Sequence, residues 1–253
     1  MSGDSKEQPN IFYTKGAPLL QAECLLNQGK VKSLYRMANE PDNVYIHFHD
    51  KVTAGNGRRV DFPEGKGKVC CLISALLFEM LENRGIRTHY IDCPSLDTLL
   101  CKKLEIVPVE VIVRNITAGS IVRQTTLQEG NRLDPPLVEY FLKDDAKDDP
   151  LLTLDRVKLM GIDPEPMKDV ALKINNHFQI LFAQLGIDIV DFKLEFGYDS
   201  NGNLCLGDEL SPDNMRLWMK GTKERFDKDL FRKDEGDIVG AYTYILEEMR
   251  KFV

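Results

Sequence analysis

The chain has 253 residues, of which 43% are hydrophobic and 29% are charged, and its formal net charge is −7. A chain of this length can bury a sizeable core without disulfide bonds or a structural metal. Because it is acidic and has no concentrated basic stripe, we do not expect nucleic acid as its main partner. A few well-placed cations would still suffice to bind phosphorylated small molecules.

The cysteines and the apolar segments indicate a cytoplasmic protein. The six cysteines lie in apolar runs without C-x-x-C spacing, which is typical of reduced thiols in a cytosolic core. No apolar run reaches the roughly 18 residues of a membrane span, and the polar start MSGDSKEQPN does not resemble a signal peptide. We therefore expect no membrane partner.

The first half of the chain is predicted to be rich in strands. Its first ten or so residues are polar, and we expect them to be loosely held. Strand-like patterns cover residues 31–35, 43–48, 88–91, 99–104 and 107–113, and Pro108 pushes the beginning of the last of these toward a sheet edge or a connection. Apolar residues between 69 and 81 recur at helical spacing, and Gly85 marks the end of that helix.

The second half is predicted to mix helices with a β-hairpin. A short helix over 119–129 is followed by a turn-rich segment, 131–136, and a longer helix runs from 163 to about 185. Two strands, 187–198 and 203–210, precede a final helix over about 237–252. This order indicates an α+β chain with two lobes and a cleft between them, not a regular βαβ alternation.

The predicted hairpin gathers negative charge on one face. With Asn201-Gly202 as a two-residue loop, Glu195 falls opposite Asp208, where like charges repel. The strand period of two puts the carboxylates and a lysine of the first strand on one face and its apolar side chains on the other. The first group is Asp191, Lys193 and Glu195, and the second is Phe192, Leu194 and Phe196. Mg²⁺ bound by Glu195 and Asp208 would relieve the repulsion. The alternative is a solvated polar face that Lys193 neutralises.

Phosphate sites are less sharply marked. The chain has no Walker P-loop and no G-x-G-x-x-G that opens a helix. Lys30 and Lys32 share one strand face after Gly29, which suits a small anion site, although alternating lysines usually mark a solvated strand face. Arg114 leaves a strand shortly before Gly119-Ser120 begins a probable helix, and both features favour anions. Arg216 can supply a second cation. The four histidines form no ligand spacing, and we assign them no catalytic role.

Two long segments in this chain resemble a known enzyme family. LEIVPVEVIVRNITAGS (104–120) and IVDFKLEFG (189–197) are similar to hallmark segments of the phosphoribosylaminoimidazole-succinocarboxamide synthases, or SAICAR synthetases, in their single-function form. Further similar segments are QGK (28–30), YFLKDDA (140–146) and LGDELSPD (206–213), so the resemblance covers nearly the whole chain.

The resemblance implies a reaction and a fold. The reaction is the ATP-dependent ligation of L-aspartate to 5-amino-1-(5-phospho-D-ribosyl)imidazole-4-carboxylate, through an acyl phosphate, to give SAICAR, ADP and phosphate in purine synthesis. The fold is a two-lobed α+β arrangement related to ATP-grasp enzymes, with antiparallel sheets, flanking helices and a nucleotide cleft between the lobes. We expect a loose N-terminus (1–16), a β-rich lobe (17–105) and an α+β lobe (106–253). No carboxylase domain is attached, so we expect the synthase activity alone.

The resemblance also implies roles for individual residues. The implied catalytic residues are Lys193, Asp191, Glu195 and Asp208, of which Glu195 and Asp208 hold Mg²⁺. The implied ATP-binding residues are Lys30, Lys32 and Lys143 at the phosphates, Lys102 and Ile106 at adenine, and again Glu195 and Asp208. The implied ribotide-binding residues are Arg114, Ser120 and Arg216, with Ser211 and Asp213 close by. The chain departs from the family pattern at Asn56, where many members carry an acidic residue, and at Asn214, where a smaller residue is common.

Two other functions fit the same residues less well. A small-molecule kinase of a related two-lobed fold would also use ATP and Mg²⁺ but would form a phosphoester. A catalytically inactive nucleotide-binding regulator would not need the retained lysines, Glu195 and Asp208. The sequence does not fix the oligomeric state, and a homodimer is compatible with it.

Overall fold

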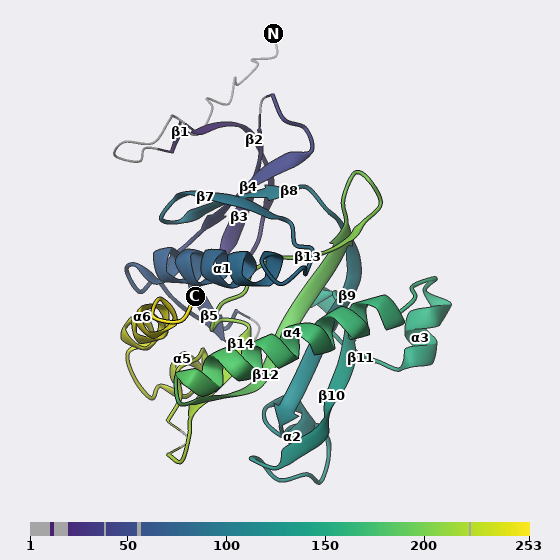
Figure 1. The fold of residues 1–253 in the computed structure, drawn as a ribbon, viewed down its shortest axis with the longest axis vertical. Coiled ribbons are helices and arrows are strands. Elements are labelled where there is room, and N and C mark those ends of the chain that lie inside the picture. Colours follow the sequence, from purple (N-terminus) through teal and green to yellow (C-terminus); the bar gives the residue numbers. More distant parts are fainter. Residues whose placement is uncertain (1–10, 13–19, 38, 55–56, 223) are drawn as a thin grey trace.

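Two antiparallel sheets form the framework of the protein in a computed structural model, which describes residues 11–12, 20–37, 39–54, 57–222 and 224–253 (Figure 1). The first sheet has six strands. In spatial order they are β1 (Ile11–Phe12), β2 (Leu20–Gln28), β3 (Lys32–Met37), β4 (Asn43–Phe48), β8 (Thr98–Lys102) and β7 (Tyr90–Ser95). Strand β4 was predicted with the observed ends and β3, β7 and β8 with shifted ends, whereas β1 and β2 were not predicted. The segment 1–16, expected to be loose, lies outside the described residues apart from Ile11 and Phe12.

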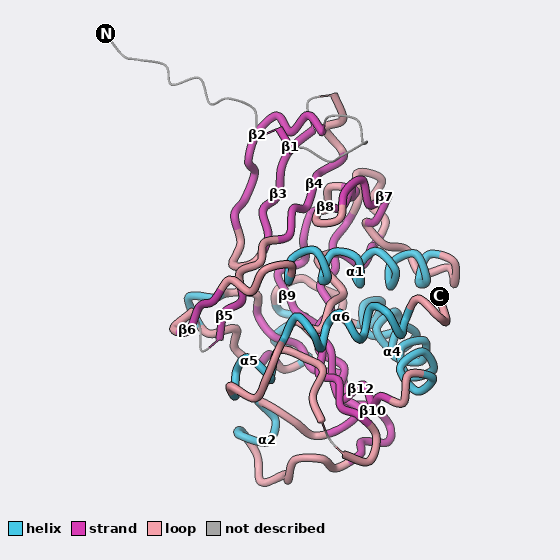
Figure 2. The backbone as a smooth tube through the Cα atoms, turned by 90° about the vertical axis from the view of Figure 1, so that its left-hand side faces the viewer, coloured by secondary structure: helices cyan, strands magenta, loops and turns pink. Residues whose placement is uncertain are grey.

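Helix α1 (Lys66–Glu82) covers one face of the first sheet (Figure 2). Its apolar positions recur every three to four residues and are buried, as the sequence predicts. A glycine in the left-handed backbone conformation lies near each end of the helix. Gly65 precedes its first turn with φ of 84°, and Gly85 follows its last turn with φ of 78°. A short ribbon of β5 (Val52–Ala54) and β6 (Arg59–Asp61) leads into the helix.

The second sheet is built around two twelve-residue strands, β9 and β12, that pair along most of their length. In spatial order its strands are β11 (Leu151–Leu152), β10 (Arg132–Leu142), β9 (Glu105–Ile116), β12 (Ile187–Tyr198) and β13 (Leu204–Gly207), with β14 (Met215–Met219) also paired to β12. The beginning of β9, which Pro108 was expected to push toward an edge or a connection, pairs with β12 alone, because the pairing with β10 starts at Val109. From Val109 on, β9 is central. The pairing with β12 shifts between Glu195 and Gly197, so Pro108 lies in a bulge where no ladder N–H is needed.

The segment 131–136 is also not a separate turn. It begins β10, whose pairing with β9 is interrupted between Arg132 and Leu137. The run after the interruption, up to Leu142, pairs regularly with β9 and was not predicted as a strand. The prolines at 135 and 136 obscure the strand pattern in the sequence.

The hairpin of β12 and β13 forms, but its register differs from the prediction by one residue. Glu195 lies opposite Gly207, and Tyr198 lies opposite Leu204. The loop is longer than Asn201-Gly202 because Asp199 accepts hydrogen bonds from the backbone N–H groups of residues 201 and 203. The predicted pairing of Glu195 with Asp208 is therefore wrong, and Asp208 lies just beyond the end of β13.

Residues 208–214 leave the edge of the second sheet and return to it farther along β12. The return is marked by the hydrogen bond from the Lys193 N–H to the Asn214 carbonyl at 2.9 Å, after which β14 continues the pairing. Asp208 begins this detour with φ of 61°, a left-handed conformation that a non-glycine residue seldom adopts. We call these residues the edge loop.

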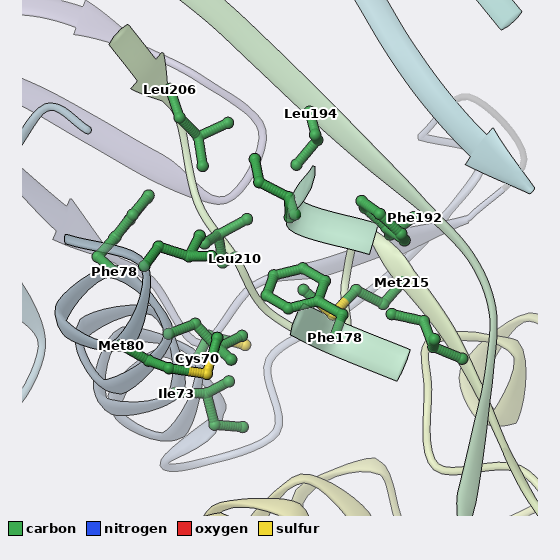
Figure 3. Close-up of a cluster of buried hydrophobic side chains, with 14 of the residues drawn as sticks. Cys70, Ile73, Phe78, Met80, Phe178, Phe192, Leu194, Leu206, Leu210 and Met215 are labelled. Atoms are coloured by element: carbon green, nitrogen blue, oxygen red, sulfur yellow. The ribbon is translucent and has the colours of Figure 1, made fainter. Parts of the chain in front are cut away.

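A long helix covers the second sheet on the face opposite Asp191, Lys193 and Glu195 of β12. The long helix α4 (Glu165–Gln184) lies across β12, where the rings of Phe178 and Phe192 have centroids 5.2 Å apart (Figure 1). Figure 3 shows side chains of α1, α4, β12 and the edge loop in one buried cluster, among them Phe78 and Leu210. The apolar face predicted for β12 is thus confirmed, and its core joins both sheets.

The remaining elements are short or close the structure at its C-terminal end. They are α2 (Ser120–Gln124), a 3₁₀ turn (Asp145–Lys147), α3 (Leu154–Leu159), α5 (Asp229–Lys233) and α6 (Ile238–Met249). The final helix packs beside α1 (Figure 1). No helix in the described ranges is both long and apolar enough to span a membrane.

Candidate active site

One large cavity of about 1190 Å³ is lined by residues of both sheets. Its volume is slightly above the roughly 300–1,000 Å³ typical of small-molecule sites. Most residues that the sequence predicts for the site line it: Lys30, Lys32, Arg114, Ser120, Lys143, Asp191, Lys193, Glu195, Asp208, Asp213 and Arg216. Residues more than 180 positions apart in the chain thus meet at a single site.

Three predicted residues do not line the cavity. Lys102 ends β8 and donates to the Thr88 carbonyl at 3.2 Å, and Ile106 is partly exposed near the start of β9. Ser211 is fully buried, and its hydroxyl donates to Oε2 of Glu209 at 2.8 Å. Asn56, the departure in the glycine loop, lies outside the described residues.

One end of the cavity holds a lysine–carboxylate network centred on β12. Nζ of Lys193 lies 2.7 Å from carboxylate oxygens of both Glu195 and Glu110, and Nζ of Lys143 lies 2.8 Å from Glu195. Burial would lower the pKa of Lys193, but the charges of Glu195, Asp208 and Glu110 outweigh it and raise that pKa well above its ordinary value. Lys193 is therefore an ammonium at neutral pH.

The edge loop supplies the second part of this network. Nζ of Lys32 lies 2.5 Å from Oδ1 of Asp208 and 2.9 Å from Oε1 of Glu209. Burial would raise the pKa of Asp208, yet the charges of Lys32 and Lys193 hold it well below its usual range. Farther out, Nζ of Lys30 and Asp145 form an exposed ion pair at 2.7 Å.

The donor chemistry at this end fits Mg²⁺. Asp208 is ionised at neutral pH, and Lys193 acts electrostatically on both Glu195 and Asp208. Oxygen ligands from one or two carboxylates, completed by phosphates and water, are what this ion prefers. Three lysine ammonium groups already lie against these carboxylates, so the region balances positive charge with negative charge before any ligand binds.

The other end of the cavity is built on two arginines that share one carboxylate. Nη1 of Arg114 lies 2.8 Å from Oδ2 of Asp191, and Nη1 of Arg216 lies 2.8 Å from the same oxygen. Arg114 also donates to Glu139 at 2.5 Å and to the Ser120 hydroxyl at 2.7 Å. The sequence prediction that Arg114, Ser120 and Arg216 lie together is consistent with this geometry.

A glycine makes this arrangement sterically possible. Gly119 precedes α2 with φ of 68°, and a Cβ at this position would lie 2.4 Å from Nη2 of Arg216. Arg216 is held from its other side by Asp229, at 3.3 Å from Nε. Burial would lower the pKa of Arg216, but Asp191 and Asp229 raise it, so the guanidinium stays charged.

Sequence reasoning missed several residues that complete the site: Glu110, Glu139, Glu209, Lys228 and Asp229. Glu110 could have been found, because the strand period of β9 places it on the same face as Arg114. Glu209 could also have been found, because it is an acidic residue directly after the predicted ligand Asp208. The others are partners across strands or loops, and no local pattern marks them.

Comparison with known proteins decides the family. A sequence profile of the SAICAR synthetase family matches residues 25–249. The chain belongs to this family. A phosphoribosylaminoimidazole-succinocarboxamide synthase of Synechocystis sp. is 49% identical over 228 residues, covering 87% of this chain and 86% of that protein. A synthase of the same name from Methanocaldococcus jannaschii is 45% identical and covers 88% of this chain and 93% of its own.

Solved SAICAR synthetases share the fold. A SAICAR synthetase in complex with ADP matches with a TM-score of 0.85 at 38% identity, covering 88% of this chain and 96% of that one. The synthase from Ehrlichia chaffeensis matches with a TM-score of 0.86 at 34% identity over 89% of this chain and 98% of its own. Family membership confirms the predicted α+β fold and the enzyme class, a carbon–nitrogen ligase of purine biosynthesis.

Proposed function

We propose that the protein joins L-aspartate to the carboxylate of 5-amino-1-(5-phospho-D-ribosyl)imidazole-4-carboxylate with ATP, giving SAICAR, ADP and phosphate. The observation that carries this proposal is the large cavity with basic side chains at each end and charged residues of β12 between them. The names and the ADP complex of the relatives point to the same substrates.

The lysine–carboxylate end would receive the nucleotide. Lys30 and Lys32, where β3 begins, and Lys143, after β10, line the cavity, and each can exchange its carboxylate partner for a phosphate oxygen. Glu195 and Asp208 would hold Mg²⁺, which when bound neutralises phosphate charge. The connection from Lys102 to Ile106 would contact adenine at the margin of the cavity, mainly through its backbone.

The arginine end would bind the ribotide phosphate. Arg216, Arg114 and Ser120 offer guanidinium and hydroxyl donors around one point, and Asp191 keeps both arginines oriented. Because the Arg114 side chain is only 1% exposed, Arg216 at 17% is the better placed of the two for direct contact, with Arg114 fixing its surroundings.

The ligation then has two steps between these ends. A carboxylate oxygen of the ribotide bonds to the γ-phosphorus of ATP and ADP leaves, which gives an acyl phosphate. The aspartate amine bonds to the acyl carbon, the bond from that carbon to the phosphate oxygen breaks, and the amine loses a proton. Phosphoryl transfer depends mainly on positioning and charge neutralisation. Lys193 is permanently protonated, so we assign it the stabilisation of negative charge and not proton abstraction.

We further propose that residues 17–105 and 106–253 act as two lobes on either side of the cavity. The change of sheet between Lys102 and Glu105 supports this division. The cytoplasmic location and a homodimer remain predictions.

The defining experiment measures phosphate release with ATP, ribotide and aspartate, each omitted in turn. A ligase releases phosphate only with all three present, and the product gains the mass of aspartate less one water. A small-molecule kinase would form ADP with a hydroxyl acceptor and no aspartate, and this outcome would overturn the proposal.

A further inference from the structure

Behind the edge loop, three polar side chains from distant elements meet in the core. Asp213 of the edge loop forms an ion pair with Lys66, whose ammonium is 1% exposed, and accepts a hydrogen bond from Oη of Tyr242 at 2.9 Å. Lys66 is the first residue of α1, and Tyr242 lies in the middle of α6 and is fully buried. Each carboxylate oxygen of Asp213 therefore has one buried donor, Oδ2 from Lys66 and Oδ1 from Tyr242.

The start of α1 is fixed tightly enough to hold Lys66 in place. A Cβ on the next residue, Gly67, would lie 2.7 Å from the Phe48 carbonyl oxygen, so α1 begins in direct contact with β4. The backbone N–H of Gly67 also donates to Asp50 at 2.9 Å. The ammonium of Lys66 is thereby held at the edge loop without reaching the cavity.

Of the three residues, Asp213 alone lines the cavity. Its two donors approach from the core, and an ionised carboxylate can accept about four hydrogen bonds, so acceptor capacity is left on the cavity side. We propose that Lys66 and Tyr242 are positioning residues that hold Asp213 as a fixed, ionised acceptor for a hydroxyl or amine of the ribotide. This inference rests on the proposed function and adds two residues that do not touch the substrate.

The electrostatics of the cluster favour this assignment over a metal site. Cys70, Glu209 and Asp213 bring potential ligand atoms within 4.8 Å of one another. The ammonium of Lys66 already supplies a cation to them, and burial raises the pKa of the Cys70 thiol, which keeps it protonated. Burial alone would raise the pKa of Asp213, but Lys66 and Lys228 lower it to about 2.

The alternative to positioning is a buried ion pair that only fastens α1 and α6 to the edge loop. Tyr242→Phe separates the two, because it removes one oxygen and keeps the ring in the core. The matched control is Tyr140→Phe, since Tyr140 is 3% exposed, donates to the Pro164 carbonyl at 3.4 Å and does not line the cavity. Both variants lose a buried hydroxyl. If this loss only destabilises the fold, ribotide binding should change equally in both variants.

The experiment compares ribotide KM, ATP KM and kcat of the full chain, with ribotide binding measured by calorimetry without ATP. In Tyr242→Phe we expect ribotide KM and Kd to rise about tenfold while ATP KM changes less than twofold, because a donor to a charged acceptor is lost. Tyr140→Phe should leave all four values within twofold. Lys66→Gln should raise ribotide Kd further, with circular dichroism reporting whether it folds.

The pH dependence of ribotide binding distinguishes the two roles. If the cluster only fastens α1 and α6 to the edge loop, this pH dependence should be the same in Tyr242→Phe and in the wild type. The charged and titratable groups facing Asp213 are Lys66 and Cys70 on α1, Lys228 before α5, Tyr242 on α6 and Glu209 in the edge loop. Loss of the Tyr242 donor raises the pKa of Asp213, so ribotide affinity should weaken at a higher pH on the acid side than in the wild type.

Equal ribotide Kd values and equal pH profiles for wild type, Tyr242→Phe and Tyr140→Phe would overturn the inference. Wild-type protein that turns over without ribotide or aspartate would instead overturn the proposed function. The two results can be told apart, because the first compares ribotide Kd between variants and the second concerns the substrate requirement of the wild type alone.

Discussion

Replacing Asp208 by asparagine removes a carboxylate from the nucleotide end of the cavity and leaves the backbone undisturbed. Asp208 has φ of 61°, and asparagine tolerates this left-handed conformation as well as aspartate does. Alanine does not, so Asp208→Ala adds backbone strain to the loss of charge. The asparagine variant therefore reports the effect of losing the carboxylate charge alone. The further loss of stability in the alanine variant reports the cost of the left-handed backbone conformation.

The expected loss of stability in Asp208→Asn is modest. Breaking a fully buried ion pair costs about 3–5 kcal/mol, but Lys32 keeps Glu209 at 2.9 Å, so we expect about 1–2 kcal/mol. For a chain of this size this corresponds to a fall in Tm of about 3–6 °C. The folded-state pKa of Asp208 is depressed, so its contribution is present above the ordinary aspartate pKa and is lost as pH falls through the folded value. The difference between the two proteins should shrink below about pH 4.

The expected loss of turnover is much larger, about 100-fold or more, because the proposed function places this charged group at the reacting phosphate. Phosphate release at saturating ATP and Mg²⁺ measures it, and calorimetric Tm confirms that the variant is folded. Titration of Mn²⁺ against the ADP-bound protein gives a second readout, in which Asp208→Asn should bind the metal more weakly. Turnover within twofold of wild type together with unchanged metal affinity would refute the assignment of Asp208.

Three further predictions concern other parts of the cavity and its surroundings. Glu195→Gln should abolish turnover and lower Tm at least as much as Asp208→Asn does, because it removes a buried carboxylate partner of Lys193, while the apolar face of β12 preserves the fold; near-normal phosphate release at saturating Mg²⁺ would contradict the assignment. Gly119→Ala should raise ribotide KM at least tenfold, because its Cβ would displace Arg216, while ATP KM stays within twofold. Burial raises the folded-state pKa of Asp227 to about 7, so its contribution to stability falls as pH rises from about 4 to 7, and Asp227→Asn should flatten that slope in urea unfolding. An unchanged slope would refute the buried, protonated state.

The face of β12 could be predicted from the sequence, but its register could not. Alternation is a property of every strand, so Asp191, Lys193 and Glu195 share a face whatever the loop does. The register depends on loop length, and the side chain of Asp199 extends the loop beyond Asn201-Gly202 by bonding to the backbone. The carboxylates nevertheless occupy the same cavity, because Asp208 turns into it from the beginning of the edge loop.

Other site residues could be found only in three dimensions. Glu139 reaches Arg114 from β10, a strand whose pattern is hidden by prolines near its start. Asp229 reaches Arg216 from a short helix that no periodicity marks. Local propensity carries no information about such pairs, because each partner is set by tertiary packing and not by its own sequence neighbours.

The course of β12 along the cavity fixes a length. Asp191 and Glu195 are four residues apart, so a strand rise of about 3.3 Å per residue separates the arginine end from the carboxylate end by about 13 Å. In the proposed function, the ribotide must be long enough to place its phosphate at the arginine end and its reacting carboxylate near the carboxylate end. An imidazole carboxylate without the ribose phosphate would be too short to engage both ends at once. Selection by size thus follows from the spacing of backbone units in one strand.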